Sequence, residues 1–260
     1  MIYGLTVENI LTGALIFVRV SAILFAMPFF GDAPTPVQIR ILLGVALAFL
    51  MQAVVPANWL ESLPQDPIAY AILVLREICI GLFLGFVARL AFDAIIMAAS
   101  LVGFQMGFGV ADLFMPDADM QMNAFTAFHR IVLMMIFLTL NLHHMYIDGM
   151  ARTFTLIPAG GVLPDKDLGV FLIKMTSGVF TVAMQMAAPV LVALLFANTA
   201  LGLVARTVPQ LNVFTMSFPV GFFIGLFVYM ACLPYYPEWA GGYFEQARLN
   251  MLETIKGLAP

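Results

Sequence analysis

The sequence predicts an all-α protein built from about six long apolar helical segments, of the kind found in integral membrane proteins. Hydrophobic residues make up 63% of the 260 residues and charged residues only 10%, whereas soluble domains carry roughly 25% charged residues. The apolar runs are apolar on every face, while membrane-spanning β-strands alternate apolar and polar positions, so helices are expected. This composition excludes a free soluble domain and a disordered chain. The net charge of −4 excludes a nucleic-acid binder, which needs a basic surface.

Six apolar segments, separated by polar or Pro- and Gly-rich joints, define the predicted helices. They span residues 10–30, 39–55, 68–105, 124–147, 170–204 and 213–233. The first segment is expected to stay in the mature protein, because the first charged side chain is Glu8 and no basic cluster precedes the segment. The whole chain, residues 1–260, is expected to form a single domain. Its tail, residues 233–260, is amphipathic, with Tyr243 and Ala247 recurring at helical spacing, and is expected to dock on a partner or on lipid headgroups.

Two of the segments are too long for a simple membrane crossing. Residues 68–105 contain no proline, and as one helix they would span about 57 Å, against a hydrocarbon core of about 30 Å. Residues 170–204 would span about 52 Å, with a bend expected at Pro189. Either each segment is a broken pair of helices, or these helices do not simply cross a bilayer.

Among the ionisable side chains inside the apolar segments, we single out Arg19, Arg76, Glu77, Arg89 and Asp93. Ionisable groups at membrane depth are rare and often have a functional role. Arg89 and Asp93 are four residues apart, so a helix places them on one face as an ion pair. Two interpretations stay open: a proton or ion relay, and a buried structural pair that fixes how helices or subunits fit together. We favour the structural pair, since a proton pathway more typically leaves one carboxylate unpaired.

Glycines four residues apart predict close contact between helices. Three such pairs occur, at Gly81 and Gly85, Gly103 and Gly107, and Gly221 and Gly225. On a helix this spacing stacks two glycines on one face, which lets another backbone approach closely.

The joint between the third and fourth segments, residues 106–123, is too apolar for a solvated loop and too rich in Gly, Asp and Pro for a helix. Its glycines permit tight turns, and its unbranched thioethers repack around irregular or changing surfaces. The joint is interpreted either as a loop tucked into a core or as a deformable plug in a conduit. The residues assigned to the plug are Met106, Gly107, Phe108, Gly109, Val110, Leu113, Phe114, Met115, Met120 and Met122.

No motif predicts an enzyme, a cofactor or a bound metal. Cys79 and Cys232 lie apart in apolar runs, and the sequence contains no HExxH, CxxC or Walker motif. His143 and His144 are adjacent, so a helix points them about 100° apart. His144 and Asp148 have helical spacing, but two ligands do not make a metal site. The prediction is a non-enzymatic protein.

The joint after the fifth segment is predicted to direct packing and assembly. Pro209 prevents a continuous helix into the sixth segment, and polar side chains beside it can satisfy the backbone groups freed at the break. The residues assigned to this motif are Arg206, Pro209, Gln210, Asn212 and Pro219.

The same joint carries the most specific signature in the chain. The run Arg206-Thr-Val-Pro209-Gln210-Leu211-Asn212, followed by Ser217-Phe218-Pro219, resembles the signature of the FliR family of type III secretion export-gate proteins. The length and the six apolar segments match this family from end to end. Further stretches similar to the family are Arg19 with Pro28-Phe29, Pro34 with Pro36 and Arg40, Arg76-Glu77 with Gly81 and Gly85, Gly103-Phe104-Gln105-Met106-Gly107, and Ile157-Pro158 with Gly160-Gly161.

The resemblance implies a function that spacing alone does not. Members of this family assemble with FliP and FliQ homologues, joined by FlhB, into a helical gate in the flagellar basal body of the bacterial inner membrane. Unfolded export substrates pass through its centre, and the loop corresponding to residues 106–123 is expected to plug the closed channel. The run from Pro209 to Pro219 is closer to the flagellar branch than to the injectisome branch.

Two other classes of function remain open on the residues alone. The first is a small-molecule secondary transporter with Arg89 and Asp93 near its substrate. The second is an intramembrane enzyme that uses His144 or Asp148. A transporter is expected to work alone or as a homo-oligomer, whereas a gate subunit is expected to be unstable without its partners.

Overall fold

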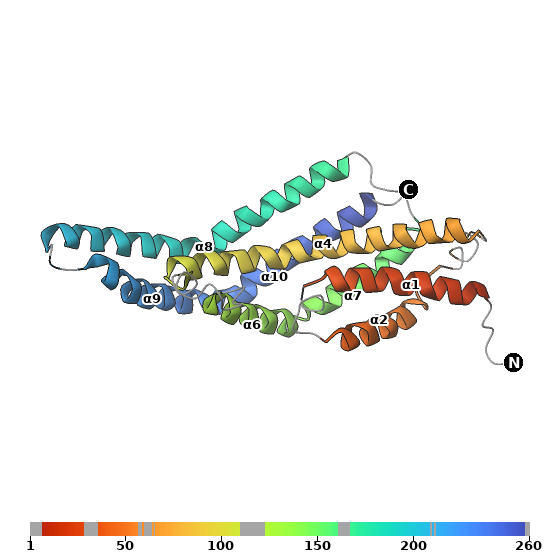
Figure 1. Cartoon of the computed structure of the whole chain (residues 1–260), viewed down its shortest axis with the longest axis horizontal. Coiled ribbons are helices and arrows are strands. Elements are labelled where there is room, and N and C mark those ends of the chain that lie inside the picture. Colours follow the sequence, from red (N-terminus) through yellow and green to blue (C-terminus); the bar gives the residue numbers. More distant parts are fainter. Residues whose placement is uncertain are drawn as a thin grey trace. The chain divides into compact units, whose positions relative to one another are not determined.

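The structure is a computed structural model that describes residues 7–28, 36–56, 59, 64, 66–109, 123–160, 167–208, 210 and 212–257. Over these residues it contains α-helices and one short 3-10 helix, with no strand (Figure 1). The predicted all-α class is therefore confirmed. The helices are α1 (Val7–Ala26), α2 (Val37–Met51), α4 (Pro67–Gln105), α6 (Ala124–Thr139), α7 (Leu142–Leu156), α8 (Asp167–Thr207), α9 (Val213–Cys232), η1 (Leu233–Tyr235) and α10 (Tyr236–Gly257).

The chain divides into two compact units, and three helices run through both. The first unit comprises Met1–Phe92, Asn141–Met175 and Phe244–Pro260. The second comprises Asp93–Leu140 and Thr176–Tyr243. Each unit therefore combines stretches from distant parts of the sequence, and each has its own buried residues.

The two over-long segments are continuous helices. α4 has 39 residues and α8 has 41, which corresponds to about 58 and 61 Å at 1.5 Å per residue. α8 contains Pro189, and Figure 1 shows a bend along it, consistent with the backbone hydrogen bond that an internal proline removes. Because each segment is one continuous helix, neither is a broken pair. Both helices are about twice as long as a hydrocarbon core is thick, so neither fits a simple membrane crossing.

The fourth apolar segment, expected as one helix, is two helices. α6 ends before Leu140 and α7 begins after Asn141, and the two helices are bent by 69° at this break. Asn141 has a positive φ of 55°, a conformation that asparagine tolerates better than most residues.

The expected amphipathic tail is helical. α9 passes through the single turn η1, which has a proline in its first turn, into α10. α10 buries Phe244 and Met251 and exposes Glu245 and Gln246, as an amphipathic helix does.

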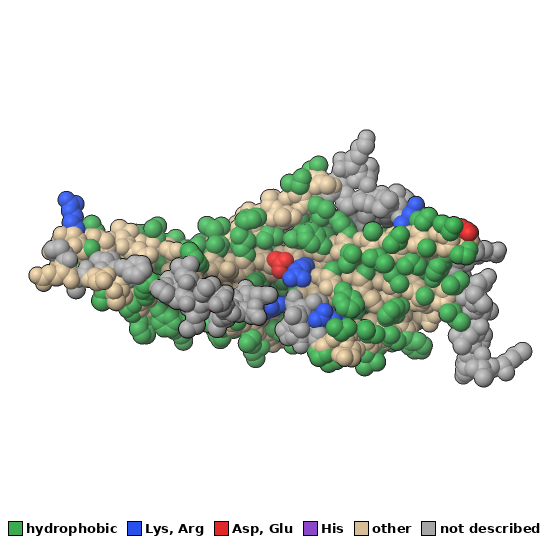
Figure 2. Space-filling model, in the orientation of Figure 1, with side chains coloured by type: hydrophobic (Ala, Val, Ile, Leu, Met, Phe, Trp, Pro, Cys, Tyr) green, Lys and Arg blue, Asp and Glu red, His purple; other side chains and the backbone are tan. Residues whose placement is uncertain are grey.

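The described part of the chain contains four helical stretches that are long and apolar enough to cross a membrane. They are Asn9–Ala26, Pro67–Gln105, Leu172–Thr207 and Thr215–Glu253, and the bent pair α6–α7 adds a fifth if it is one span. Figure 2 shows hydrophobic side chains spread over the visible surface, with few charged ones among them. Leu42 and Phe49 on α2 are 70% and 75% exposed, which suits lipid or protein neighbours and not water.

The first unit is held together by close contact between α1 and α4. A methyl group built on Gly81 would lie 2.5 Å from the Ala22 side chain, and one on Gly85 would lie 2.4 Å from that of Ala26. α1 also packs against α2. The Gly81 and Gly85 spacing therefore does what the sequence predicted, because the bare α-carbons bring two backbones together.

Candidate functional site

The segment predicted to be the plug is described at both of its ends. Met106, Gly107, Phe108 and Gly109 follow α4, and Asn123 precedes α6. The other assigned plug residues lie outside the described residues; they are Val110, Leu113, Phe114, Met115, Met120 and Met122.

A Schellman motif ends α4 at the start of this segment. The amide of Phe108 donates to the carbonyl of Gly103 (3.0 Å), and the amide of Gly107 donates to that of Phe104 (3.1 Å). Gly107 has a φ of +96°, which this motif requires at that position and which favours glycine. The two bonds fix the direction in which the chain leaves the helix.

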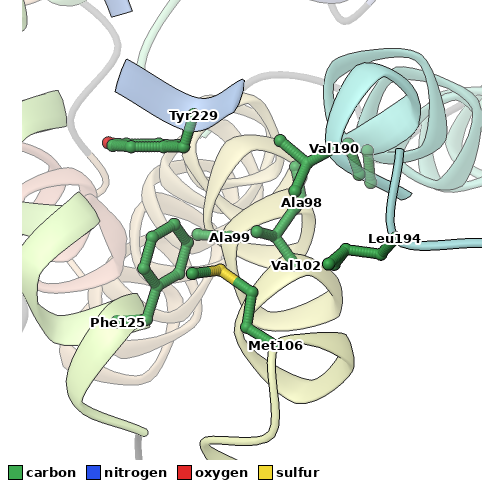
Figure 3. Close-up of a cluster of buried hydrophobic side chains, with 10 residues drawn as sticks. Ala98, Ala99, Val102, Met106, Phe125, Val190, Leu194 and Tyr229 are labelled. Carbon is green, nitrogen blue, oxygen red and sulfur yellow. The ribbon is translucent and has the colours of Figure 1, made fainter. Parts of the chain in front are cut away.

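Met106 anchors this end of the segment in the core of the second unit. Its side chain is only 3% exposed. Figure 3 shows the side chain of Met106 extending toward the ring of Phe125. The cluster that Met106 joins comprises Ala98, Ala99, Val102, Phe125, Ala183, Ala187, Val190, Leu194 and Tyr229.

Phe108 adds a second apolar contact. Its ring centroid lies 5.7 Å from that of Phe222 on α9 and 6.1 Å from that of Phe125 on α6, distances typical of favourable aromatic pairs. Its packing ties the first residues after α4 to two further helices.

The other end of the segment is fixed by a helix cap. The Asn123 side-chain oxygen accepts hydrogen bonds from the amide (2.8 Å) and the hydroxyl (2.9 Å) of Thr126, as an N-cap residue does. Asn123 also lies against Gly103, where an added methyl group would come within 2.6 Å of that oxygen. The chain between residues 109 and 123 therefore leaves from and returns to one place at the end of α4.

The first unit contains a buried ion pair between Arg19 on α1 and Glu77 on α4. Both side chains are fully buried. The Arg19 Nε donates to Glu77 Oε2, and Nη2 donates to Glu77 Oε1 at 3.0 Å. This bidentate geometry is the strongest form of a side-chain ion pair.

The remaining donors and acceptors of this pair are satisfied by the chain around the end of α7. Arg19 Nη1 donates to the carbonyls of Thr153 (3.0 Å) and Ile157 (3.1 Å), which lie in and after the last turn of α7. The amide of Gly160 donates to Glu77 Oε1 at 2.8 Å. The guanidinium carbon lies 4.8 Å from the ring centroid of Trp59, within cation–π range.

The other three charges that the sequence singled out lie elsewhere on α4. Arg76 is exposed, which differs from the expected burial, because one residue step turns it about 100° away from Glu77. It donates to the Gly160 carbonyl at 3.3 Å. Arg89 and Asp93 are partly buried and lie one turn apart on the same helix.

The assembly motif is described in part. Pro209 lies outside the described residues, Arg206 and Gln210 are exposed, and Pro219 lies inside α9. Asn212 caps α9, because its side-chain oxygen accepts the amide hydrogen of Thr215 at 3.2 Å. The sequence predicted this role for an amide beside the proline.

Replacing Asn212 with alanine is expected to destabilise the start of α9 by about 1 kcal/mol, the usual cost of a lost N-cap. The melting temperature of the protein, purified in detergent together with the partners that stabilise it, measures the effect. Asn212→Ser, which keeps an acceptor, is the control and is expected to retain most of the stability. Equal melting temperatures for Asn212→Ala and the parent would contradict the capping role.

No metal site appears in the described ranges, where no three His, Cys, Asp or Glu side chains gather. Asp148, considered with His144 as a ligand pair, forms an exposed ion pair with Arg152 at 2.8 Å. Sequence reasoning missed the cap at Asn123, although Asn before an apolar run is a recognised start signal. It also missed the partners of Arg19, which no local pattern indicates.

Comparison with known proteins identifies the family. The sequence model of a family described as "Bacterial export proteins, family 1" matches residues 10–247. The chain is 33% identical to the flagellar biosynthetic protein FliR of Bacillus subtilis (strain 168), over 84% of this chain and 85% of that protein. The chain belongs to the FliR family.

Other FliR proteins agree. Identity is 30% to FliR of Pectobacterium carotovorum subsp. carotovorum, over 88% of this chain and 87% of the relative. Identity to FliR of Escherichia coli (strain K12) is 28%, over 91% of this chain and 89% of that protein. This FliR-family chain is therefore a flagellar export protein, a non-enzymatic transport component of the export apparatus in the bacterial inner membrane.

Proposed function

We propose that this FliR-family protein is a subunit of the flagellar type III export gate. With FliP and FliQ homologues, and with FlhB joining them, it forms the channel through which unfolded flagellar proteins pass. Both compact units act together as one functional domain. Residues 106–123 form a plug that seals the idle channel and moves aside for a passing chain.

The observation that carries the plug proposal is the fixing of both ends of this segment at one place. The Schellman motif at Gly107 and the buried side chain of Met106 hold one end. The Asn123 cap, which rests on Gly103, holds the other. A seal must stay attached while it moves, and a segment with both ends fixed by helix termini meets that need without a covalent or metal link.

The outward surface of α8 supports assembly with other subunits. α8 buries Ala183, Ala187, Val190 and Leu194 on one side, and Gln185 lies exposed near the middle of the Leu172–Thr207 stretch. An amide facing hydrocarbon leaves its donors and acceptors unsatisfied, at a cost of a few kcal/mol. A protein neighbour that hydrogen-bonds Gln185 removes this cost. By contrast, α9 exposes Phe223, Phe227 and Met230, a surface that suits lipid.

Co-expression tests the assembly part of the proposal. The full chain, expressed with FliP and FliQ homologues from the same genome, is expected to purify as a stoichiometric complex and to be unstable alone. A chain that purifies as a stable homo-oligomer and takes up a small solute would favour the transporter instead.

Shortening the plug tests the gate mechanism. Deleting residues 112–117 is expected to leave the complex intact but to make cells leak ions and small molecules. Assembly survives because the ends are fixed by helix termini, and halving a loop changes its closure free energy by only about 0.6 kcal/mol. Ion permeability of cells expressing the full gate is the measurement, with the parent as control. Normal complex yield together with unchanged permeability would remove the plug and return the segment to simple packing.

A further inference from the structure

We propose that Gly225 is a positioning residue for the plug, because its bare α-carbon leaves the space in which Met106 sits. Met106 in turn fixes the place from which the plug segment begins. This inference rests on the proposed function of residues 106–123. It assigns a role in the gate to a glycine on α9, which is distant in sequence from the segment that it controls.

The contact between the two residues is tight. A methyl group built on Gly225 would lie 2.6 Å from Cγ, 3.0 Å from Sδ and 3.2 Å from Cε of Met106. Distances this short lie inside van der Waals contact, which for carbon pairs is about 3.5–4.0 Å. All the side-chain atoms of Met106 beyond Cβ thus lie against this one glycine, and no larger residue fits there unless Met106 moves.

Met106 is buried among packed side chains. It is 3% exposed and packs in a cluster with Phe125 on α6, Leu194 on α8 and Tyr229 on α9 (Figure 3). Protein interiors are close-packed, so a displaced side chain pushes its neighbours or its own backbone. Met106 lies between the end of α4 and the turn at Gly107. A displaced Met106 side chain would therefore shift the backbone at this point.

α9 also contacts the turn itself. A methyl group on Gly107 would lie 2.8 Å from the Phe218 ring, and Gly107 already requires a positive φ. One helix thus carries two contacts with the start of the plug segment, Gly225 with Met106 and Phe218 with Gly107. Through these contacts α9 sets where the segment leaves α4.

Gly221 provides a matched control one turn earlier on α9. An added methyl group there meets nothing nearer than 4.0 Å. Gly221→Ala and Gly225→Ala give the same gain in helix propensity, so they differ in the contact with Met106. A leak that occurs with Gly225→Ala and not with Gly221→Ala is therefore caused by the contact with the Met106 side chain and not by a change in the helix propensity of α9.

The test measures ion permeability and yield of the assembled gate for Gly225→Ala, Gly221→Ala, Met106→Ala and the double variant Met106→Ala/Gly225→Ala. We expect Gly225→Ala to leak several-fold more than the parent, toward the level of the shortened plug, and Gly221→Ala to match the parent. In the Met106→Ala background, Gly225→Ala is expected to add no further leak, because the atoms that it displaces are gone.

Two results would overturn the inference. One is a tight gate with normal yield for Gly225→Ala. The other is that Gly225→Ala increases ion permeability by the same amount in the parent and in the Met106→Ala background. If Gly225→Ala fails to assemble, the double variant decides: recovered yield supports the coupling, and no recovery overturns it. Failure of the shortened plug to leak removes the proposed plug role of residues 106–123 instead, and the coupling between Gly225 and Met106 is then measured from the melting temperatures of the four variants.

Discussion

Replacing Glu77 with alanine is expected to lower the free energy of unfolding by about 3–5 kcal/mol, the typical cost of leaving a buried charge unpaired. Arg19 would keep its hydrogen bonds to the carbonyls of Thr153 and Ile157 but lose its only carboxylate partner among the described residues. The Gly160 amide would lose its acceptor as well. A destabilisation of this size is a large fraction of the total stability of a typical domain, about 5–15 kcal/mol, so the yield of folded protein and of assembled gate should fall together.

The melting temperature of the complex with FliP and FliQ homologues, purified in detergent, and the yield of that complex measure this effect. Arg76→Ala is the matched control, because Arg76 is the adjacent residue but is exposed, and surface substitutions usually change stability by less than about 0.5 kcal/mol. The double variant Arg19→Met/Glu77→Met removes both charges and is expected to recover part of the loss. If Glu77→Ala assembles normally but abolishes export, the pair has a role in transport and not in structure.

Introducing methyl groups at Gly81 and Gly85 is expected to separate α1 from α4. The added atoms would lie 2.8 Å from the carbonyl oxygen of Arg19 and 2.7 Å from that of Ile23. Backbone atoms cannot rotate away as a side chain can, so the helices must move apart. Overpacking of this kind typically costs about 1–3 kcal/mol at each site. The movement would also draw Arg19 away from Glu77, and the double variant should therefore be among the most damaging in the chain.

Glycines in α8 provide the comparison. Among the described residues, nothing lies within 4 Å of a methyl group built on Gly178 or Gly202. Alanine there is expected to be neutral or to stabilise the helix by up to about 1 kcal/mol. The melting temperature is the measurement for both pairs, because complex yield also depends on the outward surface of α8 that is proposed to contact other subunits. Similar losses from Gly178→Ala and Gly81→Ala would show that the contact with α1 is not the cause.

The sequence predicts the helical class and most helix positions because hydropathy acts locally. It does not predict the break at Asn141, since a single αL residue inside an apolar run changes the chain direction without changing its composition. The amphipathic tail was visible as a repeat of apolar positions, but its direct continuation from α9 through η1 was not.

The sequence predicts which segment forms the candidate site but not the contacts that fix its ends. The unusual mixture of Met, Gly and Asp marks residues 106–123, but the packing of Asn123 on Gly103 depends on two helices meeting. The sequence predicts Arg19 and Glu77 both to be buried charges, yet they are 58 residues apart. Only folding brings them together, because no spacing rule connects positions on different helices. The sequence also predicts burial for Arg76, because composition alone does not show which face of a helix a residue occupies.

Both ends of the proposed plug segment lie at the end of α4, and this limits how far from α4 the segment can reach. Residues 110–122 are 13 residues of chain between Gly109 and Asn123, and a fully extended chain covers at most about 3.3–3.6 Å per residue. Since the chain must go out and come back, its midpoint can lie no farther than roughly 22–25 Å from the end of α4. In the proposed gate, this tether length sets the widest opening that one copy can cover, and a wider channel would need further segments from other subunits to complete the seal.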